Sequence, residues 1–163
     1  MGCTTTPLLV RGNNYSEYSG QYYKISFFAY GPGTPVEGKK SIAGHASVSI
    51  DRDGVYGFYP SKPQRFATKK GVLKYSREYP ITQDYTDFLV DEDTKNKIVE
   101  LINEWENNPP PFIVSISDCV KFIYRVCDIM GLNYHPLTLL PKNAVRDIRN
   151  LNNHYRIYTA LGP

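Results

Sequence analysis

Cys119 is the residue of this chain that is best placed for covalent chemistry. It follows the polar segment Ser115–Asp118 and begins a stretch whose apolar residues recur at helical spacing. A sulfur in the first turn of a helix lies among unpaired backbone N–H groups at the positive end of the helix dipole. This position favours the thiolate, the nucleophilic form of cysteine. A structural role stays open beside the chemical one, because the same thiol could simply be buried on the core face of the helix.

A cysteine nucleophile needs a base within hydrogen-bonding reach, and the chain has three histidines. His45 opens the strand-like segment Ala46–Ile50 and follows Gly44, which lets a second backbone or a substrate approach closely. His135 and His154 lie in polar segments and are expected at the surface. A cysteine at a helix start and a histidine at a strand start are the components of a papain-like site, where imidazole takes the thiol proton. On its own, a histidine on a strand is more typical of a structural position.

The remaining cysteines indicate no further chemistry. Cys127 falls on the apolar stripe of the Cys119 helix and is expected in the core, and Cys3 lies in a polar N-terminal stretch. An odd count of three excludes a disulfide framework, and the spacing does not fit a zinc site, so we predict no metal and no cofactor. The opening Met1–Thr6 fits the loose pattern for myristoylation of Gly2, with Cys3 open to palmitoylation, a pattern often met by chance.

The composition is that of one globular domain. The chain has 163 residues, of which 41% are hydrophobic, so we expect a single domain over 21–163 after a loosely ordered arm over 1–20. A net charge of +3 is too small for a nucleic-acid footprint. No run approaches a membrane span of about 20 apolar residues, and no cleavable leader is recognised, so a soluble protein is expected. Fourteen tyrosines predict half-buried strands and an aromatic-lined surface or cleft.

Strands are expected in the first half of the chain. The aromatic run 21–30 reads as a strand, and the segments 45–50 and 55–59 flank the turn Asp51–Gly54 as a β-hairpin. A short strand is predicted at 72–75. The Gly- and Pro-rich segment between the first two strands and the basic segment after the hairpin are predicted to be loops, at 31–40 and 60–70.

Helices are expected in the second half. Helical periodicity begins after Pro80, with capping residues near Asp91, and the helix stops at 107–111, where three prolines follow two asparagines. A second helix is predicted over 119–130 and ends at Gly131, and a third begins near Pro141 and includes Ile148. The segment 154–161 is expected to form a last strand. Together these elements predict an α+β fold with a small antiparallel sheet packed against helices.

Two segments carry a resemblance to a known family. GHASVSI at 44–50 with YGFYP at 56–60 resembles the histidine-bearing hairpin of circularly permuted NlpC-type papain-like proteins. PIT at 80–82 and SDCVKF at 117–122 resemble the cysteine-bearing half, and the histidine strand precedes the cysteine helix as in the permuted group. The pairing looks most like the bacterial toxin branch, which is carried by type VI secretion or Rhs systems. The resemblance covers about residues 21–131, and only the residues around His45 and Cys119 are diagnostic.

The resemblance implies roles for individual residues. Cys119 would be the nucleophile, His45 the general base, and the backbone N–H of Cys119 the main oxyanion donor. The family often has asparagine before its cysteine, where this chain has Asp118, a departure that could raise the thiol pKa or cap the helix. The third, imidazole-orienting residue has no clear match, and Tyr59 is the candidate on the neighbouring strand. Substrate contacts are expected from Gly44, Ser47 and Asp118.

The implied function is hydrolysis of an amide bond through a thioester-linked acyl-enzyme. The toxin branch implies a peptidoglycan-targeting amidase or endopeptidase, acting as an interbacterial effector in a target-cell periplasm after export by a specialised system. A peptide or peptidoglycan-like substrate and a cognate immunity protein would be its partners, without nucleic acid. Two alternatives stay open: acyl transfer, thioester hydrolysis or isopeptidase activity on a lipid or protein conjugate, and a catalytically silent papain-like module that binds a partner.

Overall fold

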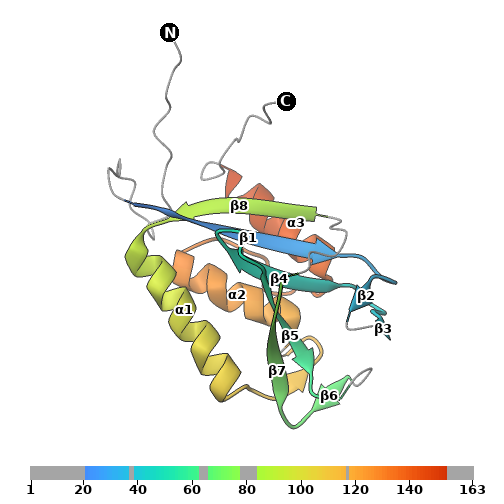
Figure 1. Ribbon diagram of the computed structural model, residues 1–163. Helices are drawn as coiled ribbons and strands as arrows, with labels where there is room; N and C mark the ends of the chain where they lie inside the picture. Colours follow the sequence, from blue (N-terminus) through green and yellow to red (C-terminus); the bar gives the residue numbers. More distant parts are fainter. Residues whose placement is uncertain (1–20, 37–38, 63–65, 78–83, 117, 154–163) are drawn as a thin grey trace.

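The strands that carry the candidate residues form one antiparallel sheet. The computed structural model describes residues 21–36, 39–62, 66–77, 84–116 and 118–153; the expected N-terminal arm and the expected last strand at 154–161 lie outside them. Within this part of the chain, five strands are ordered β7-β5-β4-β1-β8, and three helices pack against them (Figure 1). The molecule is therefore a mixed α+β structure, as the sequence predicts.

The centre of the sheet follows the predicted strands closely. Strand β1 (Tyr23–Tyr30) pairs with β4 (His45–Ile50), and β4 continues through the predicted turn into β5 (Val55–Pro60), which pairs with β7 (Gly71–Ser76). Asp51 and Arg52 both adopt positive φ in that turn. The ladder between β4 and β5 has only the pairs Ser47↔Gly57 and Val48↔Tyr56, so the two strands separate toward the His45 end of β4.

Both segments predicted as loops contain short paired strands. The first holds the ribbon of β2 (Pro35–Val36) and β3 (Lys39–Lys40). The second holds β6 (Ala67–Thr68), which pairs with β9 (Phe112–Ile113) just before the cysteine helix. The backbone N–H of Val114 donates to the carbonyl of Phe66 at 3.0 Å and extends this second ribbon by one position.

The prediction that helical structure begins after Pro80 is wrong in its first part. Residues Asp84–Val90 form strand β8, which pairs with β1 along seven residues. Thr86, Phe88 and Val90 stand opposite the core-facing side of β1, with other residues between them, a period of two that fits a strand. Pairing with the edge of β1 is a long-range interaction, and helical spacing further along the chain does not indicate it.

The three helices confirm the sequence prediction for their own segments. Helix α1 (Glu92–Asn107) is capped by Asp91, whose side chain accepts from the Thr94 backbone at 2.9 Å. Helix α2 (Cys119–Met130) has the predicted bounds and ends at Gly131 in the left-handed conformation. Helix α3 (Pro141–Leu151) begins with proline at its first position.

The core lies between the helices and one face of the sheet. Alternate residues of β1 and β4 join the buried residues of all three helices in a single apolar cluster; those contributed by the two strands are Ile25, Phe27, Ala29, Ala46 and Val48. The intervening residues lie on the opposite face of the sheet, where Phe28, Tyr30 and Val55 form a second, small cluster. Each of these two strands thus presents two buried faces with different chemistry.

Candidate active site

Asp118 holds the start of the cysteine helix. Its side chain accepts from the backbone N–H groups of Val120 at 3.0 Å and Lys121 at 3.1 Å, and its second oxygen accepts from Ser115 at 2.7 Å. The carboxylate is buried and acts as the N-cap of α2. Asp118, expected at a substrate contact, is therefore placed with its oxygens directed at the backbone around the cysteine.

The Cys119 sulfur lies against the first residues of β4. The backbone N–H groups of Ala46, Val120 and Cys119 itself lie within reach of the sulfur and favour the thiolate. Burial has the larger, opposite effect: only 9% of the residue is exposed, and desolvation together with the charge of Asp118 raises the pKa of the thiol to about 12. The sulfur is therefore protonated at neutral pH in this conformation.

His45 lies on the other face of the same strand. Its ring stacks on Tyr59 with centroids 4.2 Å apart and on Tyr30 at 6.3 Å, and it lies directly over Gly57 of the neighbouring strand. The Nε2 atom is buried and has no hydrogen-bond partner among the described residues. Desolvation by burial lowers the pKa of the imidazole to about 3, so the ring is neutral at physiological pH.

The structure brings the two elements together but does not join the two side chains. The sulfur of Cys119 reaches the backbone of Ala46, the residue directly after His45. Because side chains alternate along a strand, Ala46 faces α2 while His45 faces away from it. No hydrogen bond connects the thiol and the imidazole, and both groups are uncharged. The arrangement is a nucleophile and a base on opposite sides of one strand.

The other expected residues surround His45 on its own face. Tyr59 contacts the imidazole through the stacked rings, on the strand that the sequence indicated. The Ser47 hydroxyl is buried and hydrogen bonds to the Tyr30 hydroxyl at 2.9 Å. Gly44 adopts a φ of +82°, its carbonyl accepts from the Ser41 hydroxyl, and a Cβ there would collide with the Tyr30 carbonyl. Its glycine identity is thus explained by the backbone packing.

Two further residues of the His45 surroundings, Tyr30 and Gly57, are not among the candidates that the sequence predicts. Tyr30 is directly opposite His45 in the β1–β4 ladder and contributes both a ring and a hydroxyl to the surroundings of β4. Gly57 leaves room for the imidazole. The alternation in HASVSI separates its apolar residues from its polar residues, His45 included, but the strand pairing that brings Tyr30 and Gly57 to His45 has no such local signal.

The remaining candidates fall outside the site. Cys127 is fully buried in the core, as expected, and burial raises the pKa of its thiol. His135 is exposed in the loop after α2, also as expected. Cys3 and His154 lie outside the described residues. Across the described part of the chain, no group of three or more His, Cys, Asp or Glu side chains could hold a metal ion.

Comparison with protein-family models, with curated proteins and with solved structures finds no match to this chain. None of the helices in the described ranges combines the length and the apolar character that crossing a membrane requires. What can be said about function therefore depends on the residues and their geometry.

Proposed function

We propose that this protein is a cysteine hydrolase of the permuted papain-like type, with Cys119 as nucleophile and His45 as general base. The observation that carries the proposal is the placement of the Cys119 sulfur at the N-terminus of α2 beside the backbone of Ala46, the residue next to His45. Backbone N–H groups converge on this sulfur from two different elements, and such donors would also stabilise the oxyanion of an acyl-transfer reaction.

The reaction would proceed with the imidazole turned toward the helix side of β4. His45 would leave the rings of Tyr30 and Tyr59 and take the thiol proton, and the sulfur would attack the carbonyl carbon of an amide. The imidazolium would then protonate the leaving amine as the C–N bond breaks, which leaves a thioester on Cys119. Attack by water, with its proton taken by the imidazole, would release the carboxylic acid and restore the thiol.

The proposed substrate class comes from the resemblance in the sequence. A peptide stem of peptidoglycan is the proposed substrate, with the amide bond as the bond cleaved.

A second candidate function is a papain-like binding module without catalysis. The raised pKa of the thiol, the lowered pKa of the imidazole and their position on opposite faces of β4 all favour it. In this alternative, Cys119 is a core cysteine and the His45 stack is structural.

Alkylation of Cys119 by iodoacetamide as a function of pH separates the two candidates. If the protein is the hydrolase, the alkylation rate of Cys119 should rise with pH to a plateau, with a midpoint below about pH 8.5, because His45 takes the thiol proton. The substitution His45→Ala should shift this midpoint upward. His135→Ala, an exposed histidine, is the matched control. A rate that still rises above pH 10, unchanged by His45→Ala, would establish the silent module.

Activity gives the second readout of the same experiment. Purified peptidoglycan should release new amino groups when the protein is added, and Cys119→Ala should abolish this release while Cys127→Ser leaves it in place. Cys127 is the matched cysteine because it lies on the same helix, buried away from the sulfur of Cys119. Release by Cys119→Ala at the normal rate would refute the assignment of the nucleophile.

A further inference from the structure

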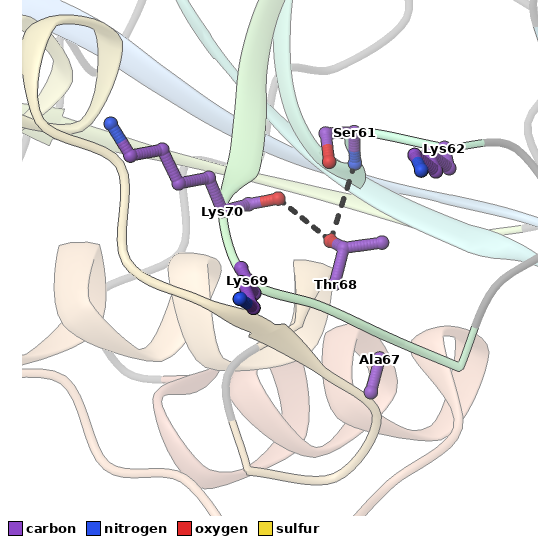
Figure 2. Close-up of a pocket in the computed structure, with 6 residues that line it drawn as sticks. All are labelled: Ser61, Lys62, Ala67, Thr68, Lys69 and Lys70. Carbon is purple, nitrogen blue, oxygen red and sulfur yellow. Dashed lines mark hydrogen bonds between the residues drawn. The ribbon is translucent and has the colours of Figure 1, made fainter.

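A basic pocket lies beside the β6–β9 ribbon, at the end of β5 beyond Tyr59. Its volume is about 480 Å³, and it is lined by Ser61, Lys62, Ala67, Thr68, Lys69 and Lys70. Figure 2 shows Thr68 between its neighbours: its hydroxyl accepts from the Ser61 backbone at 3.4 Å and donates to the Lys70 carbonyl at 2.7 Å. These bonds fix the backbone that carries the lysines.

The three lysines of this pocket are free of acidic partners. Lys62, Lys69 and Lys70 are exposed, and within the described ranges none of them forms an ion pair. Three cations on neighbouring stretches of backbone give this part of the surface a positive potential that favours an anionic ligand. Lysine ammonium groups are compact charges that pair with phosphate without a fixed geometry.

Three large apolar side chains are exposed in and directly after the β6–β9 ribbon; we call them the apolar tip, formed by Phe66, Val114 and Ile116. Their exposed fractions are 69%, 44% and 71%. Phe66 directly precedes Ala67 of the pocket wall and stands opposite Val114 in the ribbon, so the two side chains share one side of it.

Ile116 is held outward by the turn before α2. Its backbone N–H donates to the Ile113 carbonyl at 3.0 Å, Ser115 adopts a positive φ of 70°, and Asp118 accepts from Ser115. The Ile116 side chain is 71% exposed beside these contacts. Exposure of apolar side chains to water is unfavourable in free energy, and this free energy is regained when the side chains enter an apolar medium.

We propose that the apolar tip and the lysine pocket form a docking surface for an anionic lipid bilayer. The apolar side chains would enter the headgroup boundary while the lysines pair with lipid phosphates. The joint presence of exposed apolar groups and unpaired cations favours this partner, since a free anion would make no favourable contact with the apolar tip. The proposal does not depend on the proposed function, although Ile116 lies only three residues before Cys119 and docking would bring that helix start to the membrane surface.

Sedimentation with lipid vesicles tests the proposal. The protein should sediment with vesicles of phosphatidylcholine and phosphatidylglycerol and stay in solution with phosphatidylcholine alone, and raising the salt from about 0.05 M to about 0.5 M should release it. The double substitution Lys69→Gln and Lys70→Gln should weaken binding about 25-fold, from about fivefold for each lysine near the surface. The control pair Lys97→Gln and Lys142→Gln removes the same charge from exposed positions on α1 and α3.

The apolar tip is tested separately by Phe66→Ser, which should weaken vesicle binding without changing its dependence on salt. Thermal unfolding of each variant checks that the fold is retained; all the lysines changed are exposed. Equal binding to neutral vesicles, or equal weakening by the control pair, would overturn the proposal. So would displacement of the protein from vesicles by millimolar inorganic phosphate, because that outcome identifies a site for a soluble anion.

Discussion

At the scale of single residues, the contact between His45 and Gly57 decides how the imidazole is held. A Cβ added to Gly57 would meet Nε2 of His45 and would lie 2.8 Å from the Tyr59 hydroxyl. The φ angle of Gly57 is outside the region that requires glycine, so the space above it is the reason for this residue type. The imidazole is positioned as much by the missing side chain below it as by the rings beside it.

We therefore expect Gly57→Ala to destabilise the protein by about 1–3 kcal/mol, the usual cost of forcing an extra group into a packed site. Urea unfolding measures the change. In a His45→Ala background the same substitution should cost clearly less, because the nearest obstacle is gone, and the difference between the two costs gives the coupling energy of the contact. Equal costs in both backgrounds would show that the imidazole does not occupy this position.

At the scale of elements, the predictable parts are those that local chemistry decides. The bounds of α2 followed from Asp118 and Gly131, because a cap and a left-handed glycine act within one turn of the helix. Strand β8 was not predicted, because its partner β1 is far away in sequence. The orientation of His45 is a third case: its alternation with Ala46 and Val48 indicates the face away from the core, whereas pairing with Cys119 requires the core-facing side.

The start of α2 yields a prediction about Asp118. Replacing it with alanine removes three hydrogen bonds to backbone N–H groups, so we expect a loss of about 0.5–2 kcal/mol of stability, the usual range for a helix cap. Asp118→Asn keeps an oxygen for Val120 and Lys121, presents an amide to Ser115, and should cost less than the alanine.

Both substitutions remove the negative charge that contributes to the raised pKa of Cys119. The pKa of this thiol should therefore fall in Asp118→Asn, and its alkylation at a given alkaline pH should become faster. Asp128→Asn, an exposed carboxylate near the other end of the same helix, is the control for the loss of charge. An unchanged or slower alkylation rate in Asp118→Asn would contradict the effect assigned to the carboxylate.

At the scale of the whole molecule, the imidazole that is buried on the second face of the sheet makes the stability sensitive to pH. The apolar face meets the three helices, and the other face holds a buried imidazole whose Nε2 has no partner. In the unfolded chain this imidazole takes up a proton near its usual pKa of 6.5, whereas in the folded protein its pKa is lowered to about 3. Between these two values the unfolded state binds more protons, so stability falls as the pH falls.

We expect the free energy of unfolding to decrease by up to about 1.4 kcal/mol per pH unit once the pH is below 6.5. Urea unfolding at pH 7, 6 and 5 measures this, in a range above the ordinary pKa values of the carboxylates. His45→Gln should flatten the dependence and His135→Gln should leave it unchanged, because His135 is exposed. If His45→Gln does not fold, the titration of the imidazole by NMR in the unaltered protein gives the same answer. An imidazole that titrates near 6.5 there, or a stability that stays constant from pH 7 to pH 5, would mean that His45 is accessible to water and already free to turn toward Cys119.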